Sequence, residues 1–70
     1  MHRADSSKKL GINLKKLRLK KKMSQGDISR KLGVDRAYIS SIENGRMNPT
    51  LTTLEKLAEA IGVNSSELLK

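Results

Sequence analysis

The sequence predicts an all-α protein, one compact domain of five helices. Apolar residues recur at spacings of three and four, and no segment alternates apolar and polar residues as a half-buried strand would. Seventy residues allow a single core, which must be aliphatic because the chain has one Tyr and no Phe or Trp. We expect residues 1–5 to be a disordered tail and residues 6–70 to form the domain.

The first helix is expected to begin at Ser6 or Ser7, either of which can cap it, and to end near Lys22. Its apolar stripe has spacings of four and three and consists of Leu10, Leu14 and Leu17.

The second helix is expected to begin after Ser24, because Ser24 and Asp27 have the spacing of a capping box. It would bury Ile28 and Leu32 and end at Gly33, which makes it about two turns long.

The third helix is expected to follow Asp35, whose side chain can cap it. Ile39 and Ile42 would face inward, and Asn44-Gly45 would end the helix in a left-handed corner. Two short helices joined by a tight corner are typical of a helix-turn-helix.

The fourth helix is predicted after Pro49, which keeps the preceding loop extended, with Thr50 as its cap. Gly62 would end it, and its apolar side consists of Leu51, Leu54, Leu57, Ala58 and Ile61. Asn64 and Glu67 resemble a second capping box and predict a short fifth helix.

Basic charge is concentrated in one part of the chain. Residues 1–46 carry 13 Lys and Arg against 4 acidic residues, a net charge of +9, whereas residues 47–70 carry 2 against 3, a net charge of −1. This asymmetry favours a polyanionic partner for the first part, leaving the second for core packing or self-association. A basic surface that serves only solubility is the alternative.

Several classes of function are excluded by composition. The chain has no cysteine and a single histidine, His2, near its start, so neither a metal site nor a cofactor is expected. It lacks the histidines, cysteines and clustered carboxylates that supply catalytic groups, so we do not expect an enzyme. No apolar run of membrane-spanning length occurs, so a cytoplasmic protein is expected. Nothing in the sequence indicates a small-molecule ligand.

The third helix carries the strongest indication of function. On a helical wheel its buried side holds the isoleucines, whereas the opposite side is short and polar, consisting of Arg36, Ala37, Ser40, Ser41 and Asn44. Such a face suits the major groove of double-stranded DNA, where arginine pairs with guanine in a bidentate manner. We therefore expect base contacts from Arg36, Ala37, Ser40 and Ser41.

Contacts with the DNA backbone are expected from five residues around this helix: Gln25, Tyr38, Asn44, Arg46 and Asn48. Gln25 lies in the first turn of the second helix, where backbone amides attract a phosphate, although it could also be a solvated helix start. Tyr38 lies at the flank of the wheel, and packing of its ring on the second or fourth helix is an equal alternative.

Residues 10–69 resemble the lambda-repressor/Cro-like helix-turn-helix family of bacterial and phage regulators. The resemblance rests on spaced motifs: Leu17-Arg18, Ser24-Gln25, Lys31-Leu32-Gly33-Val34, Ile39, Ile42-Glu43-Asn44-Gly45, Asn48-Pro49-Thr50, Leu57-Ala58 and Ile61-Gly62-Val63. It implies a DNA-binding homodimer on a palindromic operator, with the third helix in the major groove. It further implies an ion pair of Arg18 and Glu43 that braces the first helix against the third.

Within this family, residues 35–40 are similar to the recognition helix of controller proteins of restriction–modification genes. These proteins often carry Asp-Arg-Thr-Tyr-Ile-Ser, from which Ala37 departs by lacking a hydroxyl group. Homodimer contacts are expected near the end of the chain, from Val63, Leu68 and Leu69, although burial in the core explains these residues nearly as well.

Two other functions use the same fold. In a coactivator-like module the polar face of the third helix would dock another protein, and an antitoxin would bind a toxin in addition to DNA. Enrichment of particular DNA fragments at physiological salt distinguishes the regulator from the interaction module.

Overall fold

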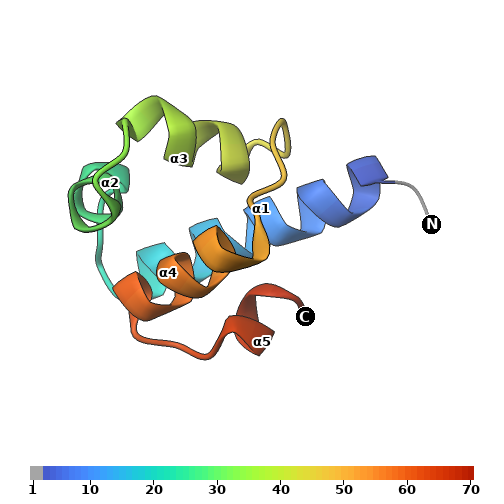
Figure 1. Ribbon diagram of the computed structural model, residues 1–70. Helices are drawn as coiled ribbons and strands as arrows, with labels where there is room; N and C mark the ends of the chain where they lie inside the picture. The colour runs from blue at the N-terminus through green and yellow to red at the C-terminus, as the bar shows by residue number, and fades with distance from the viewer. Residues whose placement is uncertain (1–2) are drawn as a thin grey trace.

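The computed structural model describes the backbone of residues 3–70 and the side chains from residue 6 onward. Figure 1 shows its helices, which are α1 (Arg3–Lys20), α2 (Gln25–Leu32), α3 (Arg36–Glu43), α4 (Leu51–Ile61) and α5 (Ser65–Leu68). The described residues contain no strand, and the predicted all-α, five-helix fold is confirmed.

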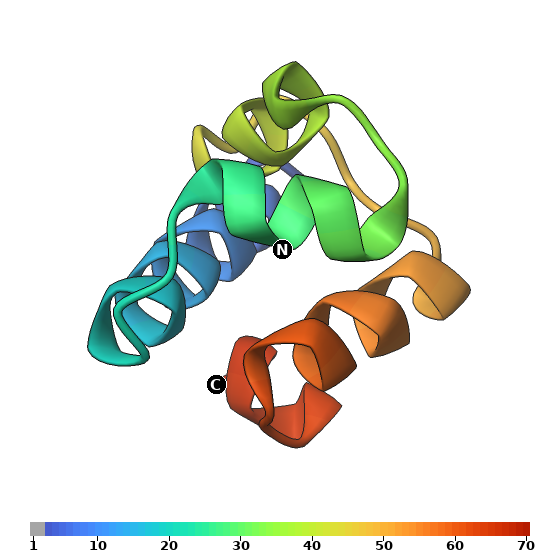
Figure 2. The same ribbon diagram turned by 90° about the vertical axis from the view of Figure 1, so that its left-hand side faces the viewer.

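The helices enclose one aliphatic core. α3 packs on α1 and α2, α4 packs on α2 and α5, and α5 returns to α1, where Asn13 Nδ2 donates to the Leu68 carbonyl oxygen at 3.0 Å. Figure 2 shows α2 lying between α3 above it and α4 below it. Every helix contributes to the core, which consists of Leu10, Leu14, Ile28, Ile39, Ile42, Leu54, Leu57, Ala58, Ile61 and Leu68.

The start of α1 differs from the prediction. The helix begins at Arg3, so neither Ser6 nor Ser7 is its first residue. Ser7 is buried within the helix, and its hydroxyl group donates to Asn48 Oδ1 at 2.5 Å. Of the tail predicted for residues 1–5, residues 3–5 belong to α1, and residues 1–2 lie outside the described residues.

Of the side-chain caps predicted for α2, α3, α4 and α5, two are present. Ser24 and Asp27 form the capping box of α2, and Thr50 caps α4 through the amide of Thr53. Asp35 and Asn64 occupy N-cap positions, but their side chains make no capping hydrogen bond. In both helices the amide three residues on donates instead to the backbone carbonyl of the N-cap residue.

Leu51 was predicted in the core, and that assignment is wrong. It lies in the first turn of α4 with 71% of its surface exposed. The helices that pack on α4 cover it only from Leu54 onward.

Candidate nucleic-acid interface

The outer side of α3 is open to solvent. Arg36, Ala37 and Asn44 are exposed, and Ser40 and Ser41 are partly exposed. Behind them Ile39 and Ile42 are completely buried, so the helix is anchored by one side and presents the other. Asn44 Nδ2 lies 3.4 Å from Ser40 Oγ, which links two polar positions of this side that are one turn apart. The division of α3 into two faces is as predicted.

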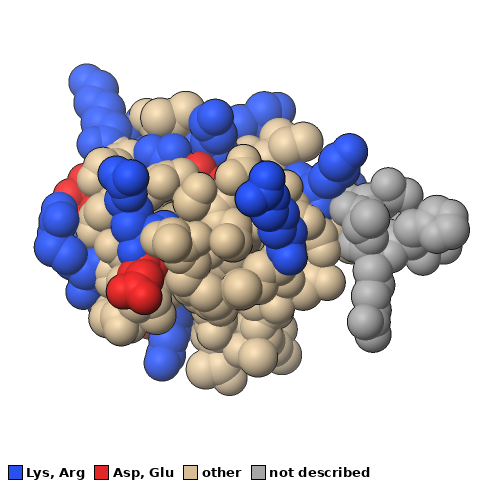
Figure 3. All heavy atoms as spheres, turned by 90° about the horizontal axis from the view of Figure 1, so that it is seen from above, with Lys and Arg blue, Asp and Glu red and all other residues tan. Residues whose placement is uncertain are grey.

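Positive charge surrounds this side of the molecule. In Figure 3, which views the molecule from above with α3 toward the viewer, Lys and Arg side chains lie both over this face and along its edge, and fewer acidic groups are seen. Because phosphate contacts supply most of the non-specific affinity for DNA, basic side chains around the polar side of α3 suit backbone contacts around base contacts.

The predicted ion pair of Arg18 and Glu43 is present and buried. Arg18 Nε lies 2.6 Å from Glu43 Oε2, and Arg18 Nη2 lies 3.1 Å from Glu43 Oε1, a bidentate arrangement. Arg18 Nη1 also donates to the Met23 carbonyl oxygen at 2.9 Å. These contacts fix the end of α3 to α1 and to the segment before α2.

Gln25 is neither a simple solvated helix start nor an unattached phosphate donor. Its Nε2 donates to Glu43 Oε1 at 3.0 Å, so Gln25 joins α2 to the ion pair. Among the described contacts, the bond to Glu43 uses one of the two amide N–H groups and leaves the other for a ligand.

The start of α2 is also fixed by Asp27. The Ser24 amide donates to Asp27 Oδ2 at 2.8 Å, and Arg30 Nη2 lies 2.6 Å from Asp27 Oδ1. The pKa of Asp27 is lowered below its usual value, chiefly by the backbone hydrogen bond from Ser24. The Ser24 hydroxyl group and Arg30 make smaller contributions in the same direction.

The corner after α3 lies against the first half of α1. Gly45 has a φ of 72°, and a Cβ atom there would lie 3.2 Å from Lys8 Cα. Arg46 and Asn48 are exposed beside this corner. The approach of α1 therefore brings Lys8, which is exposed and was not predicted at the site, next to the expected backbone contacts.

Tyr38 packs with its ring against the hydrophobic core and is partly buried. This is the packing alternative considered for the residue. Its hydroxyl group makes no hydrogen bond among the contacts described for the chain.

The residues predicted at a dimer contact differ in exposure. Leu68 is completely buried in the core, so its side chain has no surface to offer a second copy, and its assignment to an interface is corrected. Leu69 is 58% exposed, and Val63 is partly buried against the core.

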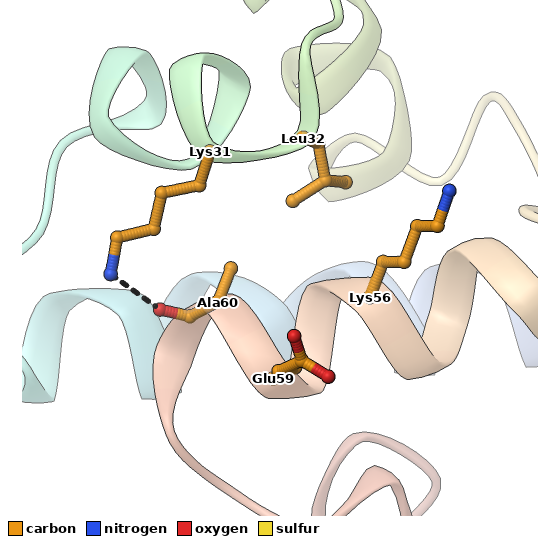
Figure 4. A pocket seen from close by; sticks show the side chains of 5 residues that line it. All are labelled: Lys31, Leu32, Lys56, Glu59 and Ala60. Atoms are coloured by element: carbon orange, nitrogen blue, oxygen red, sulfur yellow. Dashed lines mark hydrogen bonds between the residues drawn. The ribbon is translucent and has the colours of Figure 1, made fainter.

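A shallow hollow of about 460 Å³ lies between α2 and α4 and is lined by Lys31, Leu32, Lys56, Glu59 and Ala60. Figure 4 shows Lys31 reaching across it from α2, where its Nζ donates to the Ala60 carbonyl oxygen at 3.3 Å. No lining residue belongs to α3, so the hollow is separate from the polar side of that helix.

The part of the chain that the structure describes holds no group of acidic, histidine or cysteine side chains able to bind a metal ion. None of its helices has the length and hydropathy needed to cross a membrane.

Comparison with known proteins agrees with this geometry. Residues 14–68 match the helix-turn-helix family. The chain is 42% identical over 65 residues to the uncharacterized HTH-type transcriptional regulator y4dJ of Sinorhizobium fredii, covering 93% of this chain and 84% of that protein. It is 44% identical over 61 residues to the control protein C.MunI of a Mycoplasma species, covering 86% of this chain and 82% of that protein.

A solved structure with the same fold contains DNA. It is the restriction–modification controller protein C.Esp1396I as a tetramer in complex with its natural 35 base-pair operator. The two chains superpose with a TM-score of 0.77 at 35% identity, covering 91% of this chain and 95% of that one.

Proposed function

The chain belongs to the helix-turn-helix family of transcriptional regulators, which are not enzymes, and on that basis we propose that it binds a palindromic operator as a homodimer. In this proposal α3 enters the major groove, and the protein acts on promoter DNA in the cytoplasm. The similarity to C.MunI and C.Esp1396I favours a controller of restriction–modification genes.

The observation that carries the proposal is the open polar side of α3, which is backed by a buried apolar side and has basic side chains around it. A surface for a protein partner would be expected to expose large apolar side chains at its centre. The outer positions of α3 instead hold a guanidinium group, two hydroxyl groups, an amide and one methyl group, which match the edges of base pairs.

Base contacts are assigned to the N-terminal and central part of this side. Arg36 would donate to O6 and N7 of a guanine, and Ala37 would contact a thymine methyl group. Ser40 and Ser41 would hydrogen-bond to base edges in the same half-site.

Backbone contacts are assigned to the residues around α3. Gln25 would donate its remaining N–H to a phosphate, and the corner after α3 would donate through Asn44, Arg46 and Asn48. Tyr38 would contribute its hydroxyl group, which projects from a ring packed on the core.

Self-association would use Leu69 and Val63 at the end of the chain. Two copies related by a two-fold axis would then place their α3 helices about 34 Å apart, one turn of DNA. Sedimentation of the unbound protein at high concentration tests this part, and a monomer there would mean that the dimer forms only on the operator.

Selection of bound DNA from a random library, followed by footprinting, tests the function. We expect two inverted half-sites about one helical turn apart, and affinity that falls steeply with salt because phosphates are neutralised. Failure to enrich any sequence at physiological salt would contradict the proposal and favour the interaction module or the antitoxin.

A further inference from the structure

Two side-chain amides beside α3 are each held by a hydrogen bond that leads back to α1. Gln25, at the start of α2, donates to Glu43, which is bonded to Arg18 of α1. Asn48, in the loop after α3, accepts a hydrogen bond from the hydroxyl group of Ser7, also on α1. Figure 1 shows α1 running from beneath that loop toward the start of α2.

Ser7 and Arg18 lie on the same inner side of α1. They are eleven residues apart, which is about three turns and about 16 Å along a helix. Both are buried, with exposures of 5% and 7%. The residues that hold the amides of Gln25 and Asn48 in place thus belong to, or are bonded to, one helix, α1.

The hydroxyl group of Ser7 has no evident value for the helix itself. Alanine is the better helix former, and a buried hydroxyl group costs free energy unless it is hydrogen-bonded. Its partner is Asn48, an exposed residue in the loop that follows α3. The contact therefore serves the loop rather than the core.

The direction of the hydrogen bond decides which end of the Asn48 amide is available. Because Oδ1 accepts from Ser7, both N–H groups of Nδ2 remain as donors. A phosphate has only acceptor oxygens, so it requires this end of the amide. An amide held in this orientation before binding loses less side-chain entropy on binding.

We propose that Ser7 is a positioning residue for DNA binding, which holds the Asn48 amide with its amino group directed outward as a phosphate donor. Arg18 and Glu43 hold the amide of Gln25 from the other end, because Gln25 donates one N–H to Glu43 and keeps the second for a phosphate. α1 thereby fixes the spacing between the two donors. The inference rests on the proposed DNA-binding function. It assigns a role in DNA binding to Ser7, a residue that does not itself touch DNA.

The first test uses the unbound protein. Nitrogen relaxation of the Asn48 side-chain amide should show restricted motion in the wild type. In Ser7→Ala it should become as mobile as the amide of Asn64, which makes no capping bond. Equal mobility of the Asn48 amide in the two proteins would overturn the proposal.

The second test is a double-mutant cycle on the selected operator. Ser7→Ala and Asn48→Ala should each weaken binding about 2- to 10-fold, and the double variant should bind no worse than Asn48→Ala alone. Thr52→Ala, an exposed hydroxyl on α4, is the matched control and should bind as the wild type does. Thermal unfolding of each variant shows that it is folded.

The outcomes separate the two proposals. Suppose that the wild type binds its operator but the losses of binding free energy in Ser7→Ala and Asn48→Ala add up in the double variant. Ser7 then acts on the fold in general, and the positioning role is wrong. If the wild type enriches no DNA sequence, the proposed function fails, and the role of Ser7 in DNA binding fails with it.

Discussion

Gly11 of α1 lies directly against the backbone of Glu43 at the end of α3. A Cβ atom at Gly11 would lie 2.5 Å from the Glu43 carbonyl oxygen and 2.5 Å from that of Ile42. No side chain separates the two helices there, so this contact sets how closely α3 sits on the domain.

Gly11→Ala should therefore destabilise the fold. The added methyl group must push two backbone segments apart, and we expect a net loss of about 1–3 kcal/mol in the free energy of unfolding. Urea unfolding measures it. Gly26→Ala is the control, because the tightest contact of its Cβ atom would be the flexible end of Arg30, at 3.3 Å. That variant should be unchanged or up to about 1 kcal/mol more stable, since alanine favours the helix.

Glu43→Ala should be more damaging than any exposed ion-pair substitution. It leaves the Arg18 guanidinium group buried without its carboxylate, and breaking such a pair costs about 3–5 kcal/mol. Arg30→Ala removes the exposed pair with Asp27 and should cost less than about 1 kcal/mol. Equal losses in the two variants would show that the buried pair does not brace the fold.

Lys22→Gly should stabilise the protein. Lys22 has a φ of 58°, where a side chain is disfavoured. It lies just past the end of α1, where Lys22 N donates to Leu19 O and Met23 N donates to Arg18 O. Glycine normally occupies this position, as Gly62 does at the end of α4. We expect a gain of about 0.5–1 kcal/mol, measured as a higher Tm. Lys21→Gly, one residue earlier, should give no gain.

Asp27 should make part of the stability depend on acid pH. Its pKa is lower in the folded state than the ordinary value of 3.8, so the ionised capping box stabilises the fold above that pH. The contribution is lost as the pH falls through the lowered folded-state pKa. The difference in unfolding free energy between wild type and Asp27→Asn should thus be present at pH 7 and shrink progressively as the pH falls below 3.8. Asp35→Asn is the matched control, because Asp35 also occupies an N-cap region but its side chain makes no capping bond.

Features encoded in neighbouring residues could be predicted from the sequence. Ser24 with Asp27, Thr50, Gly33 and Gly62 act within one turn of where they stand, so their spacing was sufficient to place helix ends. The two faces of α3 follow from its period alone.

Features that depend on a distant segment could not be predicted in this way. Gly11 reads as a weak position inside a helix, and only the packing of α3 on it explains the absence of a side chain. Ser7 resembled a helix cap because serine is a common N-cap residue. Its actual partner, Asn48, is 41 residues away and cannot be recognised from the neighbouring sequence. Leu51 and Leu68 share the same apolar character, and only the placement of the neighbouring helices leaves one exposed and buries the other.

The affinity of Arg36→Ala for the selected operator and for unrelated DNA tests the central claim most directly. If the outer side of α3 reads bases, the operator affinity should fall by about 1–3 kcal/mol while the affinity for unrelated DNA barely changes. Equal losses on both DNAs would contradict the account, because Arg36 would then contribute only charge.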